Sequence, residues 1–573
     1  MNHLSEAQKE FIAAEGNVVL HACPGSGKTY VVAHKLLHYM KKWKRTHRGV
    51  AILSFTNVAS EEIKKRIETL ASDQFQIGYP HYIGTLDSFI NHYIVLRFGY
   101  LFVPNQVRPT IIRTDLVSLP FSWPGACYQN RCVKKIEGKS IFSGRKSNKC
   151  EGIFCRKYKN DILKKGFIFQ EDTVILAIEL LKKHPDIAKA LVSRFPILIL
   201  DEAQDTSVSQ MEILNLLNKA GSESMFLVGD PDQAIYEWRD AAPECFRNKM
   251  ADSQWNVITL TENFRSSQLI CNATHAFSKS LENKLPSIAQ GIYSEHEQKP
   301  ILLLYHGVFD DCKKKLVEYF MALCLKNEIR RCSENIAIVT RGKIYSDADI
   351  HDLWKSNEVE LFAQSSYEWF SGGRKRAYEL CEKALFCLVI ENYGQIKGSL
   401  SCEIEKKMSY HVWRIHVIDI LTHLPNVNQP IGTWINNMIV MLNEKFCDIG
   451  WILHDSRTLE QVIKIKSRDK YHSNFKDIPL RNFFERTNKE DYTLSSVHGV
   501  KGETYDALML MVSGVQGNTI TPAGLTKGAL DSELMRIAYV AMTRPRKILV
   551  VAMPHKQERY DRFPEEKWDY DYL

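Results

Sequence analysis

Residues 21–29, HACPGSGKT, decide the fold. They follow an apolar run at 17–21 and precede an amphipathic helical pattern. Glycines at positions 25 and 27 let the backbone turn its N–H groups toward phosphate oxygens. Lys28 supplies a positive charge for the β- and γ-phosphates, and Thr29 supplies a hydroxyl for Mg²⁺. The loop residues expected to contact a nucleotide are Ala22, Cys23, Pro24, Gly25, Ser26, Gly27, Lys28 and Thr29.

A pair of carboxylates follows a second apolar run. Asp201 and Glu202 come directly after Ile197–Leu200. At the carboxyl end of a parallel strand, Asp201 can hold Mg²⁺, and Glu202 can orient and deprotonate an attacking water. Together with the phosphate loop, this pair predicts an ATPase.

The spacing of apolar runs predicts the α/β class, with parallel sheets covered by helices. The first set of predicted strands is 17–21, 50–54, 197–200 and 225–228. The second set is 257–260, 301–304, 336–339, 507–512 and 547–551. Each set is interrupted by a long insertion, which predicts two sheet-based domains.

Several further segments resemble motifs of the UvrD/Rep/PcrA group of superfamily 1A helicases. They are LSEAQ at 4–8, FTNVAS at 55–60, GTLDSF at 84–89, VGDPDQAIYEWR at 228–239, LTENFRS at 260–266, SSVHGVKGETY at 495–505 and YVAMTR at 539–544. The resemblance implies two RecA-like P-loop NTPase domains with parallel sheets, each carrying an inserted subdomain. It places the first domain at 1–92 and 191–255 around a basic, Cys-rich insertion at 93–190. It places the second domain at 256–365 and 488–573 around a mainly helical insertion at 366–487.

The same resemblance implies roles around the nucleotide. Gln8 would pair with the adenine through its amide, and Phe264 would stack on that base. Gln233 would sense the γ-phosphate, while Arg265 and Arg544 would reach it from the second domain. Tyr30 stands where relatives commonly have an arginine and would stack on the base through its ring. The expected catalytic residues are therefore Lys28, Glu202, Gln233, Arg265 and Arg544.

The resemblance implies that the protein binds single-stranded DNA and moves along it. Stacking of unpaired bases on aromatic rings is worth ~1–3 kcal/mol per base and tolerates any sequence. The expected DNA contacts are Phe55, Thr56, Asn57, Thr85, Tyr236, Trp238 and His498. Asp87 departs from the family, which often has a histidine there, and a carboxylate is unfavourable beside phosphates. A second departure lies at Glu503 and Thr504, where relatives usually place the glutamate one position later.

The first insertion contains two cysteine pairs. Cys127 and Cys132 are separated by seventeen residues from Cys150 and Cys155, a spacing that suits a structural tetrahedral Zn²⁺ site. Chance clustering and an iron–sulfur cluster are the alternatives. Residues 127–165 also carry twelve Lys and Arg against three Asp and Glu, which favours a phosphate-tracking surface over a merely solvated face.

Bulk composition is compatible with this interpretation. The 573 residues carry a formal charge of +8, which permits a polyanionic partner without requiring one. The first ten residues lack the apolar core of a signal peptide, and no apolar run approaches the ~20 residues that span a bilayer. We therefore expect a cytoplasmic protein with no membrane contact and mostly reduced thiols among its fourteen cysteines.

The sequence thus predicts an ATP- and Mg²⁺-dependent DNA helicase or translocase. The resemblance implies 3′-to-5′ movement on single-stranded or partly duplex DNA, although no residue spacing gives this polarity. One alternative is a DNA-sensing helicase subunit of an anti-phage complex with a nuclease partner, because the compact size resembles the Gabija helicase subunit. A freestanding repair or replication helicase and a non-hydrolysing DNA-binding scaffold are the others.

Overall fold

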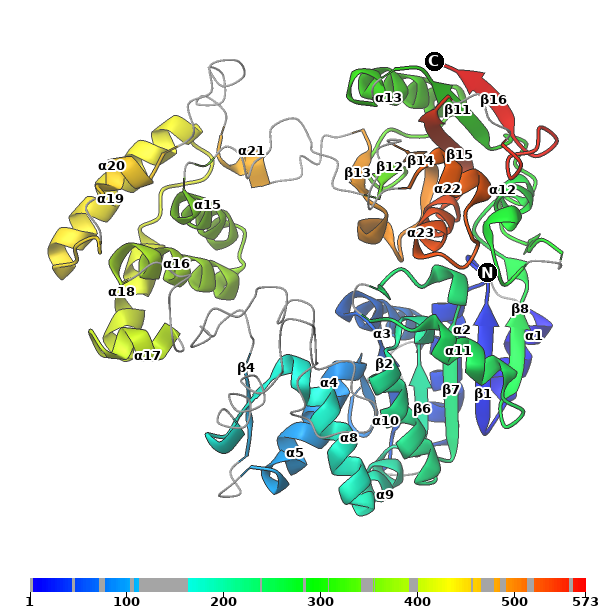
Figure 1. Ribbon diagram of the computed structural model, residues 1–573, viewed down its shortest axis with the longest axis horizontal. Helices are drawn as coiled ribbons and strands as arrows, with labels where there is room; N and C mark the ends of the chain where they lie inside the picture. The colour runs from blue at the N-terminus through cyan, green and yellow to red at the C-terminus, as the bar shows by residue number, and fades with distance from the viewer. Residues whose placement is uncertain are drawn as a thin grey trace, which may run out of the picture. The chain divides into compact units, whose positions relative to one another are not determined.

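The structure is a computed structural model of the chain (Figure 1). It describes residues 4–43, 47–71, 78–103, 108–112, 163–237, 240–281, 285–307, 309–341, 354, 356–390, 400–454, 457–464, 479–484, 491–512, 520–555 and 560–573. These residues fall into two compact units. One is drawn from Met1–Thr110, Ile136–Ile344 and Asp491–Leu573, and the other from Ile111–Lys135 and Tyr345–Glu490.

The first unit contains two parallel sheets, each with six strands among the described residues. The first sheet has the order β3-β2-β6-β7-β1-β8. Its strands are β1 (Asn17–Ala22), β2 (Val50–Ser54), β3 (Tyr82–Thr85), β6 (Ile197–Leu200), β7 (Ser224–Gly229) and β8 (Asn256–Leu260). We call the part of the unit built on this sheet the first lobe. Four of the six strands are buried from end to end or nearly so, as expected for parallel strands covered on both faces.

Strand β8 corrects one expectation. Residues 257–260 were predicted to open the second sheet, but β8 pairs in parallel with β1, from Val18 opposite Asn256 to Ala22 opposite Leu260. An apolar run by itself does not specify its neighbour, so the periodicity could not assign this strand. The wider domain boundaries stay predictions.

Helices surround the first sheet. They are α1 (Glu6–Ala13), α2 (Lys28–Lys42), α3 (Asn57–Ala71), α4 (Leu86–Ile90), α8 (Thr173–Lys183), α9 (Pro185–Arg194), α10 (Val208–Lys219) and α11 (Pro243–Ala251). Serine caps set several helix starts, because a serine hydroxyl accepts a hydrogen bond from the first turn. Ser5 and Ser207 form complete capping boxes with Gln8 and Gln210.

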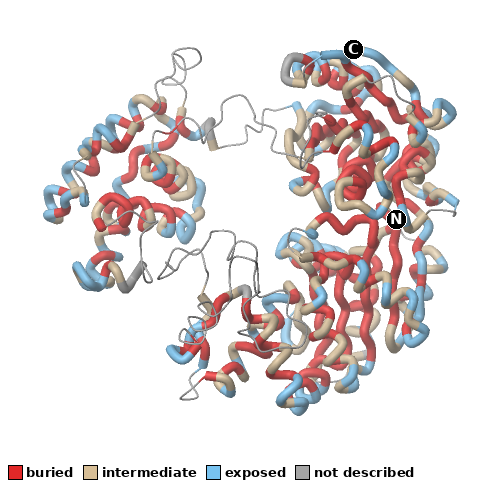
Figure 2. Tube along the Cα trace, in the orientation of Figure 1, coloured by how far each residue is buried: buried red, intermediate tan, exposed pale blue. Residues whose placement is uncertain are grey.

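The second sheet has the order β13-β12-β14-β15-β11-β16. Its strands are β11 (Ile301–Tyr305), β12 (Ile336–Thr340), β13 (Thr493–Ser496), β14 (Tyr505–Met511), β15 (Pro545–Pro554) and β16 (Asp569–Tyr572). The neighbouring helices are α12 (Gln268–Thr274), α13 (Phe309–Lys326), α22 (Pro522–Lys527) and α23 (Glu533–Met542). We call this part the second lobe. Its two apolar cores, one on each sheet face, confirm the predicted α/β class with two parallel sheets (Figure 2).

Parallel pairing determines where the loops gather. In the first sheet β2, β6, β7 and β1 are consecutive neighbours, so their carboxyl ends share one edge. The segments that leave this edge begin at Phe55, Asp201, Asp230 and Cys23. The sheet therefore places the phosphate loop, two acidic turns and an aromatic residue side by side.

The second unit is mainly helical in its described residues. Its helices are α15 (Asn357–Phe370), α16 (Arg374–Val389), α17 (Leu400–Glu405), α18 (Tyr410–Thr422), α19 (Ile431–Ile449), α20 (Leu459–Val462) and α21 (Arg481–Phe484). They share one apolar core in which Trp413 and Trp434 are fully buried. Trp413 also stacks on Trp451 with ring centroids 4.9 Å apart.

The described residues of the first insertion form elements beyond α8 and the first part of α9, which also lie within 93–190. They include α5 (Leu96–Phe98) and a two-stranded sheet of β4 (Thr110–Ile112) and β5 (Phe167–Phe169). All four cysteines of the predicted zinc site and most of the basic stretch lie outside the described residues. The zinc prediction therefore stays a prediction.

We expect Trp434→Ala to destabilise the helical unit by ~3–5 kcal/mol, because it removes a large side chain from a core that cannot refill the space. Hydrogen exchange across a urea series would report α18 and α19 separately from the two sheets. Ile452→Ala is the matched control, since Ile452 is 80% exposed and its loss should change stability by less than ~0.5 kcal/mol. An equal effect of both substitutions would contradict the assigned core.

Candidate nucleotide and nucleic-acid site

The phosphate loop has the backbone shape that glycine permits. Gly25 and Gly27 have φ angles of +75° and +81°, in the left-handed region. A Cβ atom on Gly25 would lie 2.4 Å from Asn263 Oδ1 and 2.9 Å from Arg265 Cβ, so a side chain there would require both residues to shift. The Gly25 carbonyl accepts a hydrogen bond from Phe264 N at 2.9 Å. The loop is thus closed on one side by the segment that enters the second lobe.

Lys28, the first residue of α2, points its ammonium into a buried space. Its Nζ atom is buried and makes no hydrogen bond to any described residue. Lys28 helps to lower the pKa of Glu202 and opposes the rise that burial causes in the pKa of Asp201 and Asp230, so it lies among first-lobe carboxylates. A buried cation without a hydrogen-bond acceptor is unfavourable unless an anion binds it. This orphaned ammonium, beside a helix N-terminus and curled backbone amides, fits a polyphosphate.

Asp201 and Glu202 end strand β6 in a constrained turn. Asp201 N donates to Leu53 O at 2.8 Å, and Glu202 N donates to Asp201 Oδ1 at 2.9 Å. Glu202 has a φ of +54°, which is uncommon for a residue other than glycine and costs free energy. Gln204 Nε2 donates to Glu202 Oε2 and holds that side chain in place. The turn therefore holds two carboxylates at fixed positions beside Lys28.

The two carboxylates titrate in opposite directions. Burial and the neighbouring Glu202 raise the pKa of Asp201 to about 7. Burial would also raise the pKa of Glu202, but Lys28 and Lys501 outweigh it and lower the pKa to about 2. Glu202 thus stays ionised at neutral pH and can accept a hydrogen bond from a water. Asp201 is a carboxylate that a bound cation would return to its ionised form, so the pair fits a divalent metal.

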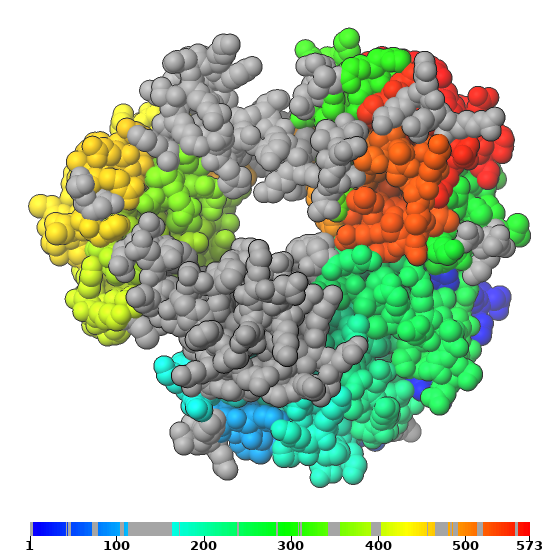
Figure 3. All heavy atoms as spheres, in the orientation of Figure 1, coloured from blue at the N-terminus to red at the C-terminus, as the bar shows by residue number. Residues whose placement is uncertain are grey.

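A hydrogen-bond chain crosses from one lobe to the other. Gln233 Nε2 donates to Asp230 Oδ2 at 2.7 Å, and Gln233 Oε1 accepts from Arg544 Nη2 at 2.8 Å. Gln233 and Asp230 follow β7, whereas Arg544 follows α23. The lobes meet here in a continuous surface, with orange atoms around α23 against green atoms of the first lobe (Figure 3). The structure therefore brings Gln233 and Arg544 into direct contact.

Arg265 and Arg544 lie close to each other and to the first-lobe carboxylates. Arg265 Nη1 donates to Thr543 O at 2.9 Å. Burial, Arg544 and Arg546 lower the pKa of Arg265 to about 9. Burial also lowers the pKa of Arg544, although Glu202 opposes this. Two buried guanidiniums that repel each other would be stabilised by an anion with several oxygens.

Lys501 contacts both the residues around the proposed nucleotide site and the aromatic residues at the lobe boundary. Its Nζ lies 2.6 Å from Asp205 Oδ2, donates to Gln233 O at 3.0 Å, and sits 4.6 Å from the Tyr236 ring centroid. Burial would lower the pKa of Lys501, but Asp205 and Glu202 outweigh it and raise that pKa. The ammonium thus remains charged at neutral pH.

Three rings lie in sequence beside Lys501. The ring centroids of Phe55 and Tyr236 are 5.2 Å apart at an interplanar angle of 31°, and those of Tyr236 and His498 are 5.8 Å apart. His498 Nε2 lies 2.9 Å from Ile235 O, so this nitrogen donates. Burial lowers the pKa of His498, which favours the neutral ring. Trp238 lies outside the described residues.

The other predicted DNA contacts lie at helix starts near these rings. Asn57 begins α3 and is exposed, and Thr56 Oγ1 accepts from Ala59 N at 3.2 Å. Thr85 caps α4. Asp87 is exposed but accepts a hydrogen bond from Gln210 Nε2 at 2.6 Å. That contact gives the unusual acid an intramolecular partner.

Residues predicted to hold the base lie on both sides of the loop. Gln8 is buried; its Oε1 accepts from Ser5 N at 3.1 Å and its Nε2 donates to Ser26 O at 3.0 Å. An amide nitrogen carries two hydrogens, so one donor is left for a base. Tyr30 packs edge-on against His34, with centroids 4.4 Å apart. Phe264 is half-buried and is tied to Gly25 through its backbone.

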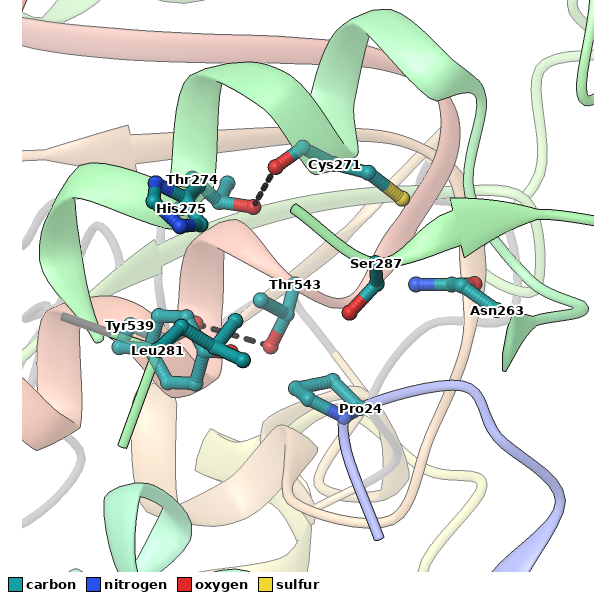
Figure 4. Close-up of a pocket in the computed structure, with 9 residues that line it drawn as sticks. All are labelled: Pro24, Asn263, Cys271, Thr274, His275, Leu281, Ser287, Tyr539 and Thr543. Carbon is teal, nitrogen blue, oxygen red and sulfur yellow. Dashed lines mark hydrogen bonds between the residues drawn. The ribbon is translucent and has the colours of Figure 1, made fainter. Parts of the chain in front are cut away.

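A small pocket lies behind the phosphate loop. Pro24 enters it from the first lobe, and the remaining lining residues come from the segment after β8, from α12 and the residues after it, and from the end of α23 (Figure 4). They are Asn263, Cys271, Thr274, His275, Leu281, Ser287, Tyr539 and Thr543. Burial raises the pKa of the adjacent Cys23 thiol to about 11, so this thiol is unreactive at neutral pH. Pro24 thus brings the phosphate loop to one wall of this pocket, and Lys28 is not among the lining residues.

Several residues of the site were not assigned a role from the sequence. Gln204 orients Glu202 and also accepts from Asp230 N at 3.1 Å. Asp205 pairs with Lys501 across the lobe boundary. Both lie within the LDEAQD segment, and Lys501 lies within HGVKG, but only the fold shows that these segments meet.

No cluster of three or more His, Cys, Asp and Glu that could hold a metal ion occurs in the described part of the chain. Within the same residues, no helix combines the length and apolarity needed to cross a membrane.

Comparison with known proteins matches both lobes. Residues 4–107 and 127–254 match the UvrD/REP helicase N-terminal domain. The chain is 24% identical to the Gabija protein GajB of Bacillus cereus (strain VD045), with 96% of each chain covered. It is 22% identical to the ATP-dependent DNA helicase PcrA of Staphylococcus aureus, over 96% of this chain and 83% of that one. A probable DNA helicase of Mycoplasma pneumoniae is 25% identical over 57% of this chain.

The shifted pKa of Asp201 predicts a pH-dependent stability. Its folded pKa of about 7 lies above the ordinary 3.8, so the folded state binds the extra proton and stability falls as pH rises between these values. We expect Asp201→Asn, without Mg²⁺ or nucleotide, to melt above the unsubstituted protein at pH 8 and to lose this advantage near pH 4. Thermal melts across pH would measure it. Asp186→Asn, at an exposed carboxylate, should change nothing, and a lower melting temperature of Asp201→Asn at pH 8 would contradict the assignment.

Proposed function

We propose that the chain is an ATP-dependent DNA motor, because residues 4–107 and 127–254 match the UvrD/REP helicase N-terminal domain and the chain is similar to PcrA and GajB over 96% of its length. In this proposal ATP is hydrolysed between the two lobes while the chain moves 3′ to 5′ along single-stranded DNA. The observation that carries it is the orphaned Lys28 ammonium, which lies with Glu202 and Arg544 at the lobe boundary. The polarity rests on the relationship to PcrA alone.

The first lobe would bind the phosphates. Loop amides and Lys28 would hold the β- and γ-phosphate oxygens, while Thr29 and Asp201 would hold Mg²⁺, which supplies charge neutralisation when bound. Glu202 is ionised and fixed by Gln204, so it can accept a hydrogen bond from the attacking water and take its proton. Water attacks the γ-phosphorus, and the bond to the ADP oxygen breaks.

The second lobe would supply the arginines. Arg265 and Arg544 would neutralise charge on the γ-phosphate oxygens, a contribution worth ~10³–10⁵ in rate in other phosphoryl-transfer enzymes. Arg544 is held by Gln233 in this structure. A γ-phosphate would compete for this guanidinium, so nucleotide state would alter the hydrogen-bond chain from Asp230 to Arg544.

The aromatic rings would carry the DNA. Gln233 is three residues from Tyr236, so a change at the nucleotide has a short covalent path to the Tyr236 ring, which lies beside the rings of Phe55 and His498. Lys501 contacts both Gln233 and Tyr236. We propose that bases stacked there shift by one step in each hydrolysis cycle, with Trp238 as a further stacking surface.

We expect Lys28→Ala to lower kcat for ATP hydrolysis by at least ~100-fold, since it removes a preorganised charge from the reacting phosphates. Steady-state assays with and without single-stranded DNA would measure this. Lys189→Ala, at a lysine whose side chain is 69% exposed, is the matched control and should keep full activity. Undiminished hydrolysis by the Lys28→Ala protein would reject the assigned site.

A second candidate function is favoured by how much of each relative's sequence the chain matches. The chain and GajB cover 96% of each other, whereas PcrA extends beyond the match. We therefore also propose that the chain acts as a helicase subunit of an anti-phage complex with a nuclease partner. Affinity purification of the tagged chain from its own cells should then recover a nuclease in near-stoichiometric amount. Recovery of the chain alone, with full DNA-stimulated hydrolysis, would favour a freestanding helicase.

A further inference from the structure

One lysine of the phosphate-loop helix is fully buried without facing the nucleotide. Lys35 lies two turns after Lys28 on α2 and has no exposed surface. Its Nζ donates to Phe11 O at 3.0 Å, to Ile12 O at 2.9 Å and to Ala14 O. An ammonium has three N–H donors, so these backbone oxygens can use all of them.

The acceptors belong to the end of helix α1. The last four carbonyls of a helix have no intrahelical partner, and a nearby cation satisfies them and the negative end of the helix dipole. Phe11 and Ile12 are in the last turn of α1, and Ala14 follows it. The ammonium also lies 4.3 Å from the Phe226 ring centroid and 5.1 Å from that of Tyr39. Lys35 thus joins α1, α2 and the β7 side of the sheet.

The other end of α1 is joined to the phosphate loop. Gln8, in its first turn, donates to Ser26 O, and Ser5 completes the capping box with it. A helix of eight residues is too short to be stable in water by itself, so its position depends on such contacts. The hydrogen bonds of Gln8 and Lys35 therefore fix the position of α1 relative to the phosphate loop and to α2.

From this arrangement we infer that Lys35 is a positioning residue for base recognition: it fixes helix α1 so that the Gln8 amide faces the nucleotide base. The inference rests on the proposed ATP site and extends it to a residue outside that site. The hydrogen bonds and ring contacts of Lys35 described above lead to α1, Tyr39 and Phe226, so its loss should affect how firmly the base is held and leave the hydrolytic carboxylates in place.

The test is Lys35→Met, which keeps the length of the side chain and removes all three donors. We expect the KM for ATP to rise about threefold to tenfold and the preference for ATP over GTP to fall by a similar factor, as for loss of one net hydrogen bond, while kcat changes less than twofold. Hydrogen exchange should quicken in residues 6–13 and stay unchanged in β1. Lys35→Arg keeps the charge and should restore most of the selectivity.

Two further variants connect the effect to Gln8. Gln8→Ala should lower the ATP preference by itself, and adding Lys35→Met to it should lower the preference no further, because both substitutions remove the same contact. Lys9→Met makes the same change at an exposed lysine of α1 and should have no effect. Independent, multiplying effects of the Gln8 and Lys35 substitutions would overturn the inference, as would an unchanged ATP-to-GTP ratio in a folded Lys35→Met protein.

If Lys35→Met does not fold, Lys35→Gln keeps two donors and serves in its place. It must show the same loss of ATP preference in smaller measure, and an unchanged preference overturns the inference. The Lys28→Ala result separates the two proposals. If Lys28→Ala abolishes hydrolysis while Lys35 variants keep normal selectivity, the ATP site stands and the role of Lys35 fails. If Lys28→Ala hydrolyses normally, the proposed function fails first.

Discussion

The parallel pairing of β2, β6, β7 and β1 is the constraint on which the rest of the first unit depends. Parallel strands end at a common edge, so four loops from distant parts of the sequence must meet there. The phosphate loop, the Asp201 turn, the Asp230 turn and the segment from Phe55 are all such loops. None of them could form the site alone, because each contributes one kind of chemistry and the sheet supplies their spacing.

The charged side chains of the site are arranged in a way that is unfavourable in free energy when no ligand is bound. An ammonium lacks a hydrogen-bond partner among the described residues, a carboxylate has a pKa near neutrality, and two guanidiniums repel each other. Each of these features is unfavourable in isolation, and each is relieved by a polyphosphate with a divalent cation. This excess of unmet charge distinguishes the region from a structural ion-pair network, such as the direct Lys501–Asp205 contact.

The sequence predicts the strands of the sheets well, because buried parallel strands are continuous apolar runs. It does not predict β3, β13 and β16, whose residues are largely half-buried or exposed, or the partner of β8. At the site, the loop and the carboxylates follow from local patterns. The roles of Gln204 and Lys501 depend on side chains meeting across long sequence distances, which periodicity does not contain. Lys35 was invisible for another reason: a lysine on a helix is ordinarily solvent-exposed, and only the fold shows it to be buried.

The crossover from the first sheet to the second lobe lies beside the phosphate loop. Leu260 O accepts from Cys23 N at 3.4 Å, and Phe264 N bonds Gly25 O a few residues later. The covalent connection between the lobes is therefore also a pivot beside the proposed nucleotide site. Any rotation about it moves atoms near the loop least and atoms at the far rim of the boundary most. A shift of the lobes by about the size of one phosphate group near the loop would then become a larger shift at the outer surface, because that surface is farther from the pivot.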